Sequence, residues 1–75
     1  MSIIQTIGTA LNQALSDERL QSFSNSNSLD GSQAFAFKTM SGESFEFTFH
    51  RDGTTQPPVS EMLGTLERLG IAVSA

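Results

Sequence analysis

The sequence predicts a small α+β domain, and two patterns support this prediction. Residues 33–50 (QAFAFKTMSGESFEFTFH) hold five of the six phenylalanines, all at odd positions. Because side chains alternate between the two faces of a strand, all five can share one face: Phe35, Phe37, Phe45, Phe47 and Phe49. Apolar residues recur at helical spacing on both sides of this stretch. We therefore expect a two-layer α-β-β-α sandwich, in which two helices cover the phenylalanine face of an antiparallel hairpin.

Residues 40–42 (MSG) are predicted to form the loop of this hairpin. In one register Thr39 faces Glu43, and the glycine of the loop takes the left-handed conformation that closes a three-residue turn. In the alternative register Lys38 lies directly opposite Glu46, which gains a surface ion pair of a few tenths of a kcal/mol. We prefer the first register, because a residue other than glycine at positive φ would cost more than that pair gains.

Residues 2–15 are predicted to form an amphipathic helix with Ser2 as its N-cap. Its apolar residues follow the i, i+3, i+4, i+7 pattern and share one face: Ile3, Ile4, Ile7, Leu11, Ala14 and Leu15. The following Leu20 and Phe23 fall nearly opposite that face when the helix is projected at about 100° per residue. Either the helix ends near Leu15 and a short turn begins with Ser16 as its cap, or a continuous helix presents its second face to a partner chain.

Residues 24–32 (SNSNSLDGS) are predicted to form a flexible, exposed loop. Ser and Asn side chains compete for backbone hydrogen bonds, and Asp30-Gly31 is a turn signal. After the hairpin, Asp52-Gly53 predicts a second turn. Residues 54–56 are predicted to be extended, because Pro57 disfavours helical conformation at the residue before it.

A second amphipathic helix is predicted to begin with Pro58 at its first helical position. Its apolar stripe consists of Val59, Met62, Leu63, Leu66 and Leu69. Gly70 fits the position that follows the helix end in a Schellman motif, where Ile71 contacts Leu66. Residues 71–73 are predicted either to add a short third strand or to cover the core.

Two glycines lie inside the predicted helices, Gly8 in the first and Gly64 in the second. Glycine in a helix interior is less favourable than alanine by about 1 kcal/mol. Each glycine is therefore interpreted either as a tolerated cost or as a place where another part of the chain packs closely.

The composition indicates one small cytoplasmic domain that spans residues 1–75. The chain has no cysteine, which excludes disulfides and thiolate zinc sites and fits a reducing compartment. Its amino-terminal segment lacks the positive residues of a signal peptide, and no apolar run approaches the roughly 20 residues of a membrane span. Eight acidic residues against four basic ones give a net charge of -4. We therefore expect neither nucleic acid nor a membrane as a partner.

His50 is the only histidine and the main candidate for chemistry. Glu46 and Thr48 are predicted to share its strand face, and Asp52 follows two residues later. An acid–base dyad beside a nucleophile, as in a small hydrolase, is therefore a remote hypothesis. An open hairpin face offers no cleft that excludes water and no oxyanion donor, and one histidine with dispersed carboxylates matches no zinc spacing. We expect neither an enzyme nor a bound cofactor or metal.

The predicted element order, α-β-β-(β)-α, resembles the layout of double-stranded-RNA-binding domains. In that family the second helix opens with lysines that bind phosphate, whereas the matching stretch here is residues 58–61 (PVSE). The resemblance therefore implies a shared layout of elements and does not imply RNA binding.

The sequence favours a non-enzymatic protein-binding module of the inhibitor or adaptor type, which acts through its surface on a larger protein. Small inhibitors encoded by phages and mobile elements have a similar size and charge. Open sheet edges and a second apolar helix face also predict a homodimer, and a self-assembling structural subunit is the alternative. The residues expected to contact a partner lie on the hairpin, its turns or the second helix face: Leu20, Phe23, Lys38, Glu43, Glu46, Thr48, His50 and Asp52.

Overall fold

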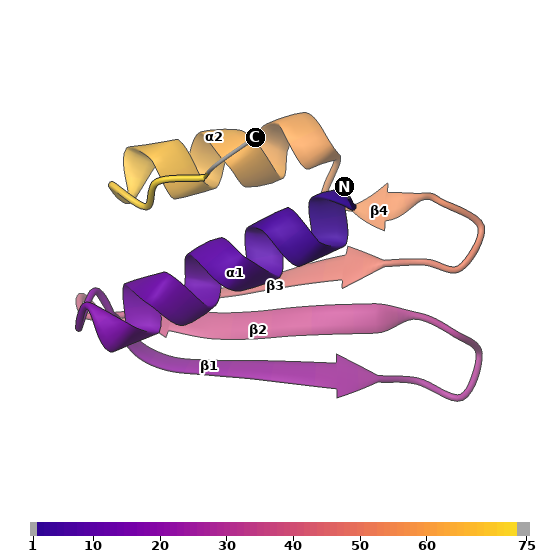
Figure 1. Cartoon of the computed structure of the whole chain (residues 1–75), viewed down its shortest axis with the longest axis horizontal. Coiled ribbons are helices and arrows are strands. Elements are labelled where there is room, and N and C mark those ends of the chain that lie inside the picture. The colour runs from indigo at the N-terminus through magenta and orange to yellow at the C-terminus, as the bar shows by residue number, and fades with distance from the viewer. Residues whose placement is uncertain (1, 74–75) are drawn as a thin grey trace.

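The computed structural model describes residues 2–73. Helix α1 (Ile3–Ser16) precedes four strands, and helix α2 (Val59–Arg68) follows them. The strands are β1 (Leu20–Asn27), β2 (Gln33–Thr39), β3 (Ser44–Phe49) and β4 (Thr55–Gln56). They form one antiparallel sheet in chain order, and both helices cover the same face of it (Figure 1). The predicted two-layer α+β class is confirmed, although the sheet has two strands in addition to the hairpin.

The β2–β3 hairpin adopts the preferred register. The Thr39 N–H donates to the Glu43 carbonyl oxygen at 2.8 Å, and Gly42 closes the loop with a φ of 96°. Only glycine adopts this left-handed conformation without a steric penalty from Cβ. Lys38 and Glu46 are diagonal neighbours across the two strands, because Ser44 rather than Glu46 lies opposite the lysine.

The phenylalanine face is the centre of the core. Four of its residues are at most 3% exposed: Phe35, Phe37, Phe47 and Phe49. Phe45, which lies beside the β2–β3 loop, is half-buried. Helix α1 packs on this face with Ile7 and Leu11, and helix α2 does so with Met62 and Leu66. These four helical side chains are fully buried, so the two apolar stripes predicted from the sequence are the faces that meet the sheet.

The predicted ends of the helices are also present. The Ser2 hydroxyl oxygen accepts a hydrogen bond from the Ile4 N–H at 3.2 Å and caps α1. After α2, Gly70 has a φ of 76°, and the Ile71 N–H donates to the Leu66 carbonyl oxygen at 2.9 Å. This is the Schellman ending expected there. Within residues 2–73, no helix is long and apolar enough to cross a bilayer.

The structure refines the predictions for the start of α2, for the segment after it and for the residues before Pro57. Pro58 is the N-cap, so the helix begins one residue later than expected. Residues 71–73 form no strand, and Ile71 instead covers the core at 5% exposure. The residues expected to be extended before Pro57 form β4, in which Gln56 lies opposite Thr48 of β3.

The predicted end of the first helix near Leu15 is confirmed and the continuous helix is excluded, but the expected turn with Ser16 as its cap is not present. Helix α1 ends at Ser16, Glu18 adopts a φ of 61°, and β1 begins at Leu20. The pairing of β1 with β2 shifts between Leu20 and Ser22, which marks a β-bulge. The bulge lets Leu20 and Phe23 both face the helices although they are three residues apart. That spacing imitates a helical pattern.

The flexible loop predicted at residues 24–32 is wrong for its first half. Residues 24–27 are the second half of β1 and pair with residues 33–36 of β2. Asn is depleted in strands, but the backbone groups of β2 supply the pairing whatever the side chains are. Only residues 28–32 connect the two strands.

The two helical glycines generate a test, because their surroundings differ. A Cβ on Gly64 would meet no atom within 4 Å, whereas a Cβ on Gly8 would lie 3.1 Å from Phe35 Cζ. Gly64→Ala should therefore raise the free energy of unfolding by about 0.5–1 kcal/mol. Gly8→Ala should raise it by less or lower it, because the Phe35 ring must move.

Urea denaturation followed by circular dichroism measures both changes, with the wild-type chain as reference. Equal stabilisation by the two substitutions would show that the Phe35 ring moves freely. A loss of stability in Gly64→Ala would contradict the interpretation of Gly64 as a tolerated cost.

Candidate functional site

The face of the sheet away from the helices is open and polar. Three residues of the predicted partner surface lie there together, Lys38 on β2 with Glu46 and Thr48 on β3. Lys38 and Glu46 are exposed, and Thr48 is half-buried. Their neighbours on this face are small: Ser22, Ser24, Ser26, Ala34, Ala36 and Ser44. The face is therefore flat, with one positive side chain near the β2–β3 loop and one negative side chain diagonal to it.

His50 and Asp52 lie at one end of the sheet, in the turn between β3 and β4. The Asp52 carboxylate accepts hydrogen bonds from the Thr54 N–H at 2.9 Å and from the Thr54 hydroxyl at 2.6 Å. Glu43 lies in the β2–β3 loop at the opposite end of the hairpin. The predicted contact residues therefore do not form one patch.

The β1–β2 loop meets this turn through a serine and a histidine. Ser32 Oγ lies 3.4 Å from His50 Nδ1, and the Asp30 carboxylate accepts a hydrogen bond from the Ser32 N–H at 2.9 Å. In a catalytic triad the carboxylate orients the imidazole. Here it holds the serine backbone instead, so the arrangement ties the loop to the turn. Among residues 2–73, no three His, Asp or Glu side chains are grouped to hold a metal ion.

Hydrogen bonds lower the pKa of both carboxyl groups in these turns. The backbone N–H of Ser32 is the main cause at Asp30, where the pKa lies below the usual 3.8. At Asp52 the main cause is the Thr54 hydroxyl, followed by the Thr54 N–H. Each bond favours the ionised form, and the charge of the nearby His50 adds to the effect at both positions.

The two apolar residues predicted to contact a partner belong to β1, and one of them is not available. Leu20 is 3% exposed and part of the core, which corrects its assignment to the surface. Phe23 is half-buried, and its ring centroid lies 5.7 Å from that of Phe35. Phe23 therefore lies at the margin of the core, beside the outer side of β1.

The outer side of β1 is an edge of the sheet that sequence reasoning missed. The Ser28 N–H donates to the Ser32 carbonyl oxygen at 2.9 Å, so Ser28 is a hydrogen-bonded residue of the β1–β2 ladder. Hydrogen-bonded and non-bonded residues alternate along an antiparallel strand. The backbone N–H and C=O groups of Phe23, Asn25 and Asn27 therefore point away from β2, at the edge.

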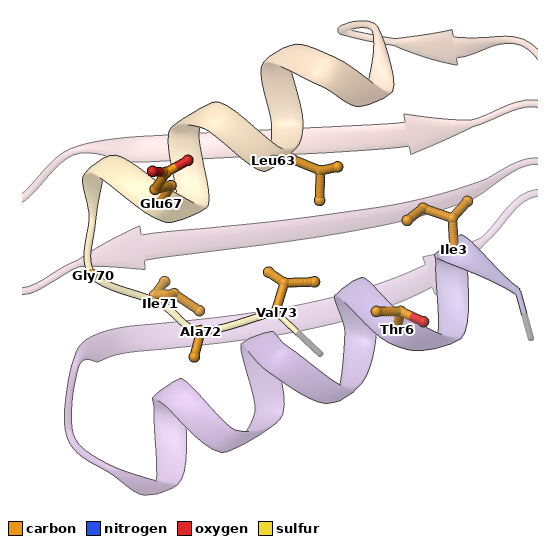
Figure 2. Close-up of a pocket in the computed structure, with 8 residues that line it drawn as sticks. All are labelled: Ile3, Thr6, Leu63, Glu67, Gly70, Ile71, Ala72 and Val73. Atoms are coloured by element: carbon orange, nitrogen blue, oxygen red, sulfur yellow. The ribbon is translucent and has the colours of Figure 1, made fainter. Parts of the chain in front are cut away.

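A second missed feature is an apolar groove between the helices. It has a volume of about 680 Å³, and its lining comes from α1, α2 and the segment after α2: Ile3, Thr6, Leu63, Glu67, Gly70, Ile71, Ala72 and Val73. Figure 2 shows residues 70–73 returning between the two helices, with Leu63 and Ile3 directed toward the gap. The sequence analysis placed Ile3 and Leu63 on the apolar stripes of the helices and residues 71–73 in a short strand or over the core, so it did not predict a groove between them.

No protein-family model matches this chain, and neither does any curated protein or solved structure. The candidate sites are therefore the surfaces of the chain itself. They are the open sheet face around Lys38 and Glu46, the edge of β1, and the groove between the helices.

The two turn carboxylates generate a prediction about acid stability. Their pKa values are lower in the folded chain, so each stabilises the fold above its unfolded pKa, and this stabilisation is lost as the pH falls through the folded pKa. The double variant Asp30→Asn, Asp52→Asn keeps an acceptor oxygen in each turn but cannot titrate. Its free energy of unfolding should fall less than that of the wild type between neutral pH and about pH 3.

Urea denaturation at several pH values between these limits gives the two profiles. Both chains share every other acidic group, so the difference between the profiles isolates the two aspartates. Parallel profiles would contradict the assignment.

Proposed function

We propose that this chain is a non-enzymatic protein-binding module of the inhibitor or adaptor type, which acts in the cytoplasm as a homodimer. The observation that supports this proposal is the open face of the sheet. Sites for small molecules are concave and mostly apolar, whereas this face is flat and polar. Contact with another folded protein needs no concave pocket, and Lys38 and Glu46 can give such a contact charge complementarity. The net charge of -4 favours a protein over nucleic acid.

The two edges of the sheet favour a dimer over an open-ended assembly. β1 is eight residues long, whereas β4 has only two residues. Pro57 and Pro58 follow β4 directly, and proline has no N–H to donate to a further strand. β1 is therefore the longer regular edge, whereas on the other side β4 and the first residues of β3 form a short, interrupted one. This asymmetry supports the homodimer rather than the self-assembling structural subunit.

Charge reversal on the open face tests the proposed binding function. Immobilised wild-type chain should retain a protein from a lysate of the cells that encode it, and Glu46→Lys should retain at least about fivefold less of that same protein. Glu61→Lys is the matched control, because it makes the same charge change on an exposed position of α2. Mass spectrometry identifies the retained protein, and circular dichroism confirms that each variant is folded.

The proposal requires that the wild type and Glu61→Lys capture the same protein and that Glu46→Lys loses it. Equal capture by all three chains, or capture by none, would contradict binding through the open face.

A further inference from the structure

We infer that two copies of this chain pair through their β1 strands, antiparallel to each other across a twofold axis at Ser24. The inference rests on the proposed homodimer and assigns its interface. In the paired state the two sheets become one continuous sheet with β1 at its centre. Both open faces then lie on the same side.

The edge of β1 is built for such pairing. The outward N–H and C=O groups of Phe23, Asn25 and Asn27 are spaced as the next strand of a ladder requires. Natural edge strands commonly carry lysine, proline or an inward-pointing charge that prevents pairing. Residues 20–27 (LQSFSNSN) contain none of these. The one bulge lies at the beginning of the strand, before Ser22, and leaves the rest regular.

The backbone directions restrict the register. A residue whose N–H points outward must lie opposite another such residue, so Phe23 can face Asn25 of the second copy. This register puts Ser24 on the axis and overlaps residues 21–27 of both strands. Phe23 of each copy then forms two backbone N–H···O=C hydrogen bonds with Asn25 of the other copy. Ser24 meets its own counterpart, and both serine side chains lie on the open face.

Apolar residues at the two ends of β1 identify a second copy as the occupant. Leu29 follows β1 and is 109% exposed. At the other end, Leu15 and Met40 are 37% and 59% exposed, and they line a recess of about 680 Å³ with Glu18, Leu20 and Gln21. Antiparallel pairing brings opposite ends together, so Leu29 of each copy lies beside the recess of the other. An unrelated strand would cover the edge without this reciprocal contact.

The charges near the proposed interface are mixed. Each copy has a net charge of -4, but β1 itself carries no charged residue. In this register Asp30 of one copy lies nearest Glu18 and Arg19 of the other, so each end of the interface brings together one pair of like charges and one pair of opposite charges. Ser24 lies at the only position where a substituted side chain meets the same substitution in the second copy.

A charge-swap experiment at Ser24 tests both the edge and the register. Sedimentation equilibrium of the wild type over a wide concentration range should show a monomer–dimer equilibrium. Ser24→Lys and Ser24→Glu should each raise the dissociation constant at least about tenfold, because like charges then lie directly opposite. An equimolar mixture of the two variants should recover dimers, since Lys then faces Glu. Gln56→Lys adds the same charge at the other edge and should leave the dimer intact.

Leu29→Ser provides a second, independent readout. Its side chain is fully exposed in one copy, so the monomer should keep its stability while the dissociation constant rises at least about tenfold. A monomeric wild type at every concentration, or dimers that persist equally in Ser24→Lys and Leu29→Ser, would overturn the inference.

The dimerisation experiment and the capture experiment can fail independently of each other. A monomer that captures a protein through Glu46 would overturn the dimer alone. A dimer whose capture does not depend on Glu46 would overturn only the proposed binding through the open face.

Discussion

Burial of the phenylalanine face of β2 and β3 is the interaction on which the rest of the structure depends. The rings form two groups, with Phe37 5.3 Å from Phe45 and 5.2 Å from Phe47 in one, and Phe35 5.5 Å from Phe49 in the other. A two-stranded hairpin is marginally stable alone in water, and so is a helix as short as α1 or α2. Each layer therefore stabilises the other, and neither is expected to persist when the rings are exposed.

This division of the sheet into a covered and an uncovered face also organises the surfaces available for recognition. The helices use one face, so residues on the other are free to vary without affecting the core. If two chains share a sheet through β1, their open faces become one surface with twofold symmetry. A partner with two equivalent contact sites would then bind both halves, and the second contact would form at a high effective concentration.

The elements that the sequence predicts well are those in which pattern and packing agree. The odd-numbered phenylalanines, Gly42 and the two helical stripes each have one arrangement that buries apolar surface without strain. β1 was missed because its bulge gives Leu20 and Phe23 a helical spacing, and because Ser and Asn dominate the remainder. The candidate site was predicted only in part. Lys38, Glu46 and Thr48 share a strand face, but strand β3 separates Glu43 from Asp52, which lie at its opposite ends.

The bulge in β1 has a consequence for how this chain tolerates changes in length. Inserting or deleting one residue in a regular strand turns every following side chain to the opposite face. A bulge already holds one residue more than the strand beside it, and that residue makes no ladder pair. Around Gln21, therefore, the addition or loss of a residue can be absorbed locally. The same change within β2 would move the phenylalanines that follow it from the core to the open face of the sheet.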